Sequence, residues 1–212
     1  MKRKTIFLGC IIATSIVLTS CSNNEEVTEE QTTTTEVEET TVETINLNVN
    51  TEESKLHWKG EMLGMYSHEG DIKLKEGSLT LENGNIKSGK FIVDMTTIQP
   101  TDENYDEEKT PEKLVGHLSS PDFFDVENFP TASFEITSVE GNVVKGNLTV
   151  RGKTNEETIN NVVINEENGN YTITGNLTFD RQKYDVSYTV TMKDMVLSDD
   201  ISLDITLKAS KQ

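Results

Sequence analysis

The feature that most constrains this chain is a strict alternation of apolar and polar residues along its C-terminal part. The pattern is clearest at 171–179, 184–192 and 201–208, and it recurs over 132–136 and 144–150. A period of two puts every second side chain on the same face, so each segment predicts a strand with one buried face. Further strands are expected at 45–50, 54–60, 68–75, 77–82 and 85–95.

Glycine-containing turns separate these segments. Asn-Gly pairs occur at 83–84 and 168–169, and a Gly-Asn pair occurs at 141–142. Such pairs between alternating runs favour tight hairpins of antiparallel strands. Strands that are apolar on one face must curl or stack to bury that face. About eight strands therefore predict an all-β fold, a closed antiparallel up-and-down β-barrel, with a two-sheet sandwich as the alternative.

One segment, near 110–124, breaks the strand pattern. Thr110, Pro111 and Glu112 match a helix N-cap, a first-turn proline and a carboxylate that suits the helix dipole. Leu114 and Leu118 then lie four positions apart, which places them on one helical face. We expect a short helical insertion that lies across one end of the barrel.

The N-terminal part has the layout of an export signal. A basic start, Lys2-Arg3-Lys4, precedes an apolar run over 5–18, as in secretory signal peptides. As a helix this run would span about 21 Å, less than the roughly 30 Å of a bilayer core, so we expect no stable membrane span. The run ends in Leu18-Thr19-Ser20-Cys21, which resembles a bacterial lipobox. We expect residues 1–20 to be removed and Cys21 to be acylated, so that the lipid anchors the chain to a membrane of the cell envelope, at the periplasmic face or the cell surface.

Residues 21–44 combine this cysteine with a segment that is too polar to fold. From 22 to 44 the sequence holds eight Glu, eight Thr and no basic residue. Its three valines are too few to form a core, so the segment is predicted to be a disordered tether. The folded domain is then expected over 45–212.

Charge and cysteine usage argue against several functions. Lys plus Arg number 19 against 37 Asp plus Glu, a net charge of −18, so nucleic acid would be repelled. Cys10 leaves with the signal peptide, and no thiol then remains for catalysis. His57, His68 and His117 are not spaced as zinc ligands, and no catalytic triad or phosphate loop is present. We predict no metal, no cofactor and no enzymatic activity.

Several motifs resemble those of the YceI family. The longest runs from His117 to Phe134 (HLSSPDFFDVENFPTASF), and Leu148 to Thr154 (LTVRGKT) is similar to the family's next element. Further matches are His68 to Gly70, Phe91 to Met95, and Asp180-Arg181 with Tyr184 and Val186. The resemblance covers roughly 54–210. It implies a lipocalin-like barrel, export to the periplasm or envelope, and a long apolar ligand, either a polyisoprenoid or a fatty-acyl lipid, and it does not imply catalysis.

The resemblance also implies which side chains meet that ligand. The expected cavity wall consists of inward-facing strand residues: Trp58, Phe91, Phe134, Leu148, Ile173, Phe179 and Tyr188. The alternative is that these side chains fill the barrel, because an eight-stranded barrel is just wide enough for either outcome. Phe123 and Phe124 are expected to form a lid at the mouth, with plain packing of the helical insertion as the alternative.

Four polar residues are candidates for contacts with a ligand head group, namely His68, His117, Arg151 and Arg181. The histidines would bind it by hydrogen bonds, unless they satisfy a local partner. The arginines would bind an anionic head, unless they pair with Asp180 or Asp185. The stretch 102–108 lacks the Arg-Asp pair that many family members carry there, and residues 45–212 hold 16 basic and 29 acidic residues. A neutral or weakly charged isoprenoid or acyl ligand is therefore an equal alternative to an isoprenoid pyrophosphate.

Together these features predict an envelope lipoprotein that binds, sequesters or carries a long apolar lipid inside its barrel. The alternative is a surface adhesin or an envelope-assembly module with a filled barrel. The sequence indicates no oligomeric state.

Overall fold

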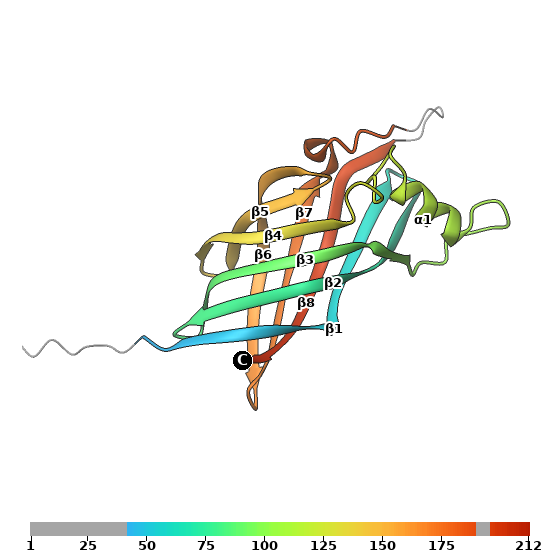
Figure 1. Ribbon diagram of the computed structural model, residues 1–212. Helices are drawn as coiled ribbons and strands as arrows, with labels where there is room; N and C mark the ends of the chain where they lie inside the picture. The colour runs from blue at the N-terminus through green and yellow to red at the C-terminus, as the bar shows by residue number, and fades with distance from the viewer. Residues whose placement is uncertain (1–41, 190–195) are drawn as a thin grey trace, which may run out of the picture. The chain divides into compact units, whose positions relative to one another are not determined.

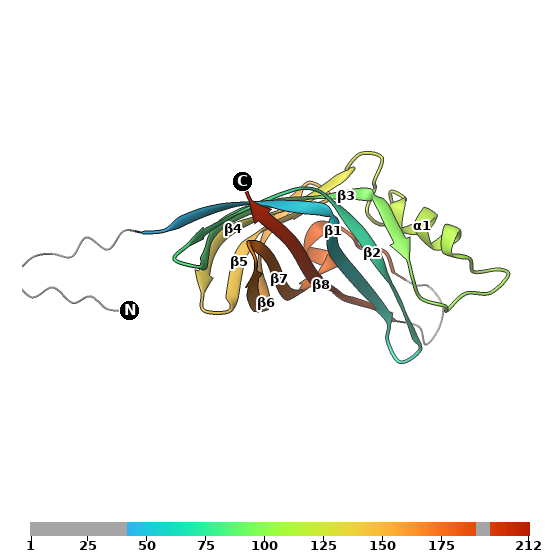
Figure 2. The ribbon, with the colours of Figure 1, turned by 90° about the horizontal axis from the view of Figure 1, so that it is seen from below.

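The computed structural model describes residues 42–189 and 196–212. The predicted signal peptide, Cys21 and nearly all of the predicted tether lie outside the described residues. Within them, eight antiparallel strands pair in sequence order, and β8 pairs with β1 to close the barrel (Figures 1 and 2). The strands are β1 (Thr44–Met62), β2 (Tyr66–Glu82), β3 (Asn85–Pro100), β4 (Thr131–Glu140), β5 (Val143–Val150), β6 (Lys153–Glu167), β7 (Asn170–Asp180) and β8 (Leu197–Lys211). The closed barrel is confirmed, and the two-sheet sandwich is wrong.

The first two strands are long because each joins two of the predicted strands. β1 includes both 45–50 and 54–60, and β2 includes both 68–75 and 77–82. The register between β1 and β2 shifts between Asn48 and Leu56, where the alternation is interrupted. A bulge of this kind bends a strand without ending it, so these interruptions mark bends and not turns.

Three hairpins turn through a pair of residues with positive φ. Asn83 (φ 49°) and Gly84 (φ 78°) join β2 to β3, and the Asn-Gly pair at 168–169 joins β6 to β7. Positive φ at both positions is the type I′ geometry that matches the twist of the flanking strands. Arg151 (φ 49°) and Gly152 (φ 71°) make the same turn between β5 and β6, although this pair is not an Asn-Gly turn signal.

The strand predicted at 184–192 is wrong over 184–189, and positions 190–192 lie outside the described residues. The chain instead forms a 3₁₀ turn, η1 (Arg181–Tyr184), followed by a segment without regular structure. The alternation still predicts which side chains are buried, because Tyr184 and Val186 are fully buried. The carbonyl groups of Val186 and Tyr188, however, accept hydrogen bonds from the Arg181 guanidinium (2.6 and 2.9 Å) and not from a neighbouring strand.

Strand β6 has no counterpart among the predicted strands. Its sequence is mostly polar, and its one buried residue is Glu157. That carboxylate accepts a hydrogen bond from the Tyr184 hydroxyl (3.1 Å) and lies 3.3 Å from the Lys183 ammonium. Pairing with β5 and β7 forms the strand although the apolar pattern is weak.

The predicted helical insertion is present as α1 (Pro111–Ser119), at one end of the barrel (Figure 1). The Thr110 side chain accepts a hydrogen bond from the backbone N–H of Lys113, as an N-cap does. The turns that follow α1 bury Phe123 and Val126. Among the residues described, no helix combines the length and apolar character that crossing a membrane requires.

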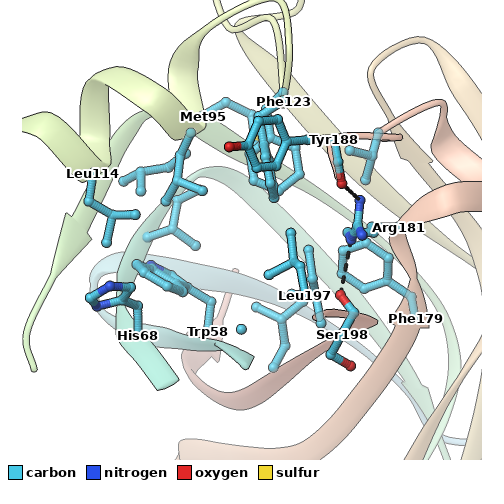
Figure 3. A pocket seen from close by; sticks show the side chains of 18 of the residues that line it. Trp58, His68, Met95, Leu114, Phe123, Phe179, Arg181, Tyr188, Leu197 and Ser198 are labelled. Atoms are coloured by element: carbon cyan, nitrogen blue, oxygen red, sulfur yellow. Dashed lines mark hydrogen bonds between the residues drawn. The ribbon is translucent and has the colours of Figure 1, made fainter. Parts of the chain in front are cut away.

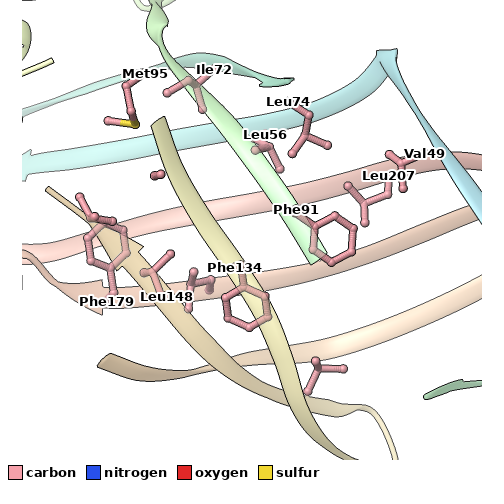
Figure 4. Close-up of a cluster of buried hydrophobic side chains, with 14 of the residues drawn as sticks. Val49, Leu56, Ile72, Leu74, Phe91, Met95, Phe134, Leu148, Phe179 and Leu207 are labelled. Atoms are coloured by element: carbon pink, nitrogen blue, oxygen red, sulfur yellow. The ribbon is translucent and has the colours of Figure 1, made fainter. Parts of the chain in front are cut away.

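Buried apolar side chains from several strands form a cluster inside the barrel (Figure 4). Phe91 and Phe134 lie opposite each other on β3 and β4 and are both nearly inaccessible to solvent. A Cβ atom on Gly146 would lie 2.6 Å from Phe134 Cε1, so this ring packs directly on glycine backbone. Dense packing of this kind leaves no room for a ligand around these rings, in the part of the barrel that we call its closed half. A second hollow of about 270 Å³ lies beyond it, beside the β2–β3 and β4–β5 hairpins, and its lining includes Ile86, Val139 and Val144.

Candidate ligand-binding cavity

A cavity of about 330 Å³ lies inside the barrel at its α1 end (Figure 3). Its wall is built by the α1-proximal ends of strands β1 to β5, β7 and β8, together with α1 and the turn after it. Apolar side chains make up most of the wall, and its few polar groups include His68, His117 and Arg181. A concave apolar surface with a few convergent polar groups is the usual form of a small-molecule site.

The volume limits what the cavity holds. About 330 Å³ is near the lower end of the roughly 300–1,000 Å³ of ligand pockets. A long chain would therefore place only one part inside the barrel, with the remainder extending through the mouth, or would need the wall to move outward.

Most of the residues expected to meet a ligand do line this cavity. Nine of the thirteen lie on its wall: Trp58, His68, His117, Phe123, Phe124, Leu148, Phe179, Arg181 and Tyr188. Phe123 and Phe124 pack edge to face on this wall, with ring centroids 4.9 Å apart. Their contact with a ligand stays a prediction.

Four of the expected residues lie elsewhere. Phe91, Phe134 and Ile173 are buried in the closed half of the barrel and do not border the cavity. Arg151 lies outside it and donates hydrogen bonds to the backbone carbonyl groups of Phe123 (3.0 Å), Pro121 (2.7 Å) and Asp185 (2.6 Å). None of these four borders this cavity, and their contact with a ligand stays a prediction. Inward alternation does not tell which layer of a barrel is hollow.

Sequence reasoning missed part of the wall. The missed residues include Met62, Ile72, Met95, Ile98, Leu114 and Leu197. Ile72 and Met95 fall inside predicted strands, and Leu114 on the predicted helical face, so their burial was foreseeable. Their position beside an open space was not, because it depends on how far α1 stands from the strands.

His68 belongs to a hydrogen-bonded cluster at the cavity edge. Its Nδ1 lies 3.2 Å from both carboxylate oxygens of Asp102, whose side chain is 6% exposed. Asp102 also accepts hydrogen bonds from the backbone N–H of Glu69 (3.1 Å) and of Asn104 (2.9 Å) and from the Tyr105 hydroxyl (2.9 Å). Burial acts to raise the pKa of Asp102, but these hydrogen bonds outweigh it and lower that pKa below its usual value.

An ionised carboxylate only accepts hydrogen bonds, so Asp102 fixes the proton of His68 on Nδ1. In the neutral ring Nε2 then accepts a hydrogen bond, and His68 is on the cavity wall. The ring of Tyr105 stacks on the imidazole of His68, with the two ring centroids 5.1 Å apart. Burial and the Asp102 carboxylate both raise the pKa of Tyr105, which keeps its hydroxyl protonated.

His117 lies in the last turn of α1 and also faces the cavity. Its ring meets Tyr188 and Phe123 edge-on, at centroid distances of 4.4 and 5.5 Å. Burial lowers the pKa of His117, against a smaller opposing effect of Asp122. The imidazole is therefore neutral at pH 7 and offers one donor and one acceptor.

Arg181 is buried at the border of the cavity, where it holds β8 to the end of β7. Its guanidinium donates to the backbone carbonyl of Ser198 (3.0 Å), to those of Val186 and Tyr188, and to the carboxylate of Asp199 (2.8 Å). The expected ion pair with Asp180 or Asp185 is wrong, because the carboxylate that Arg181 contacts is that of Asp199. Four of the five N–H donors of the guanidinium are thereby occupied by protein atoms.

The described ranges, 42–189 and 196–212, contain no group of three His, Cys, Asp or Glu residues arranged to hold a metal ion.

Comparison with known sequences points to one family. The profile of the YceI-like domain matches residues 47–209. A UPF0312 protein of Staphylococcus aureus (strain bovine RF122 / ET3-1) is 34% identical over 44% of this chain and 60% of that protein. The corresponding protein of Staphylococcus aureus strain N315 is 33% identical over the same shares. The chain thus spans about 60% of the length of these curated relatives.

Solved structures share the fold. BcnA of Burkholderia cenocepacia superposes with a TM-score of 0.62 at 20% identity, covering 76% of this chain and 99% of BcnA. A polyisoprenoid binding domain from Saccharophagus degradans, implicated in plant cell wall breakdown, gives a TM-score of 0.53 at 9% identity, covering 79% and 99%. Because the matched profile extends from β1 to β8, the chain belongs to the YceI-like family.

Proposed function

We propose that this protein binds a long apolar ligand, a polyisoprenoid or a fatty-acyl lipid, with part of its chain inside the cavity. The observation that carries the proposal is the cavity of about 330 Å³ inside the barrel, whose wall is mostly apolar. The family and the fold shared with a polyisoprenoid binding domain support the same ligand class. Burial of apolar surface at about 25 cal/mol per Å² would drive the binding.

The head group of this ligand is uncharged in our proposal. Arg181 commits four of its five N–H donors to protein atoms, and Arg151 lies outside the cavity and donates to three backbone carbonyl groups, so the cavity offers a pyrophosphate no open guanidinium. A hydroxyl or carbonyl group instead suits the neutral imidazole of His117 and the Nε2 atom of His68. The excess of 29 acidic over 16 basic residues in 45–212 favours the same choice.

The protein acts, in this proposal, as a carrier or a reservoir and not as an enzyme. We further propose that it is an envelope lipoprotein, anchored by acylated Cys21 and separated from the membrane by the Thr/Glu-rich tether. The lipobox-like sequence and the acidic segment after it support this part. Incorporation of a labelled fatty acid that disappears in a Cys21→Ser variant would test it.

Ligand binding is testable by fluorescence, because Trp58 is the single tryptophan and lies on the cavity wall. Titration with geranylgeraniol, with geranylgeranyl pyrophosphate and with palmitate should change its emission. We expect saturable binding of the alcohol and weaker binding of the two anions, the pyrophosphate and palmitate. If none of the three changes the emission or the melting temperature of the folded barrel, the proposal is wrong.

A further inference from the structure

Three exposed apolar side chains gather at the mouth of the cavity, and we call them the rim patch: Leu63, Met65 and Val196. They are 49%, 56% and 58% exposed, and in the described residues only five large apolar side chains are exposed to this degree. The other two, Val42 and Val163, lie before β1 and on β6. An exposed apolar cluster on a soluble domain usually marks a surface that contacts another body.

Backbone geometry holds the rim patch together. Leu63 and Met65 flank Gly64 (φ 74°) in the turn between β1 and β2, and that hairpin projects at the α1 end of the barrel (Figure 2). The backbone N–H of Leu63 donates a hydrogen bond to the carbonyl of Val196 (2.9 Å), which joins the turn to the start of β8. The patch is therefore one surface built from two segments distant in sequence.

The rim patch is continuous with the cavity wall. Met62, Tyr66 and Leu197, the immediate neighbours of the patch in the chain, all line the cavity. Lys109 places its ammonium 5.9 Å from the ring centroid of Tyr66, beside the same hairpin. An apolar tip backed by a tyrosine and a lysine is the composition that proteins place at a membrane–water interface.

We infer that the rim patch docks on the surface of a phospholipid bilayer and that the ligand passes directly between the bilayer and the cavity. This inference rests on the proposed function, because a long apolar lipid has its store in a membrane and crosses water slowly. The surplus of acidic residues argues for an electrically neutral bilayer surface. Partial insertion of Leu63, Met65 and Val196 would bury their exposed area and bring the mouth to the lipid.

The test compares two variants of the full chain, both carrying Cys21→Ser so that no acyl anchor contributes. One carries Leu63→Ser, Met65→Ser and Val196→Ser, and the matched control carries Val163→Ser, which removes a valine of similar exposure (48%) from β6. Phosphatidylcholine vesicles containing dansyl-labelled geranylgeraniol serve as the donor. Energy transfer from Trp58 to the dansyl group reports uptake.

We expect the control to take up the probe as fast as the parent chain, at a rate that rises with vesicle concentration. The triple variant should be slower by about tenfold or more, while its affinity for the probe dispersed in water stays unchanged. Equal rates for the triple variant and the control would overturn the inference, as would a parent rate independent of vesicle concentration.

Flotation of the same chains with probe-free vesicles separates this inference from the proposed function. If no chain takes up the probe, the proposed function fails, and loss of flotation in the triple variant alone still supports docking. Gel filtration with light scattering tests whether a second copy of the chain covers the rim patch. A parent dimer that the triple substitution turns into a monomer would show that a second copy covers the patch, and would overturn the inference.

Discussion

Alanine replacements of two phenylalanines should distinguish the closed half of the barrel from its hollow half. Phe134 is 7% exposed and packs on Gly146, whereas Phe179 is 5% exposed and lies on the cavity wall. In a packed core Phe→Ala costs about 3–5 kcal/mol of unfolding free energy, from lost burial and from the void that remains. We expect Phe134→Ala to fall in that range.

Phe179→Ala should cost less, about 1–3 kcal/mol, because the ring face toward the cavity already lacks packing partners. The cost is not zero, because the ring still meets Tyr184 edge-on at a centroid distance of 5.4 Å. The stabilisation gained from bound ligand should show the opposite order of the two variants. At 100 times Kd it adds about 2.7 kcal/mol to a barrel that binds it, and Phe179→Ala should lose more of this gain than Phe134→Ala.

The assay is urea denaturation followed by far-ultraviolet circular dichroism, with and without geranylgeraniol. Circular dichroism is preferred because a ligand beside Trp58 would alter its fluorescence directly. Equal costs for the two variants, together with equal responses to ligand, would refute the division into a hollow and a closed half.

Three further variants test individual groups. Arg181→Met leaves the carbonyl groups of Val186 and Tyr188 without their donor, so the unfolding free energy should fall by about 3–5 kcal/mol in denaturant titrations. Asp102 has a lowered pKa, so the stability that its carboxylate contributes is present above the unfolded value of 3.8 and is lost as the pH falls through the folded pKa. Asp102→Asn should therefore make the melting temperature fall less steeply at acid pH in a pH series. Burial lowers the pKa of His117, so stability that needs the neutral ring is lost as the pH falls below the ordinary value of 6.5, and binding that needs this ring is lost as the pH falls through the lower pKa of the folded protein. Fluorescence titrations over a falling pH series should show binding weaken only below 6.5, and His117→Gln should remove this pH dependence.

The strand architecture follows from local pattern wherever one face of a strand is apolar and its turn is an Asn-Gly pair. Residues 171–179 and 201–208 meet the first condition, and they form β7 and β8 in register with each other. β6 fails the first condition, because its one buried residue is a glutamate, and the turn that precedes it begins with Arg151, although an Asn-Gly pair follows it. Its existence depends on neighbours that offer free strand edges, which a local pattern does not contain.

In the segment after Arg181, by contrast, the sequence predicts a strand that does not form over 184–189. The alternation of Tyr184 and Val186 is real, but the hydrogen-bond partner of this segment is a guanidinium and not a strand. A pattern of burial therefore predicts which side chains face inward without predicting what the backbone pairs with.

The candidate site was predictable in kind and less so in position. The inward faces of β1, β5 and β7 supplied Trp58, Leu148 and Phe179, all on the cavity wall. Phe91 and Phe134 have the same pattern but close the barrel, because a glycine opposite each ring lets it fill the space. Which layer stays open depends on side-chain volumes summed across strands, and no single strand carries that information.

The most direct test of the central claim is native mass spectrometry of the protein purified without detergent, with lipid extraction of the same sample. We predict a bound species heavier than the chain by the mass of an isoprenoid or acyl lipid, which extraction removes and added lipid restores. A folded barrel that carries no lipid, and that takes up neither isoprenoids nor fatty acids when they are supplied, would contradict it.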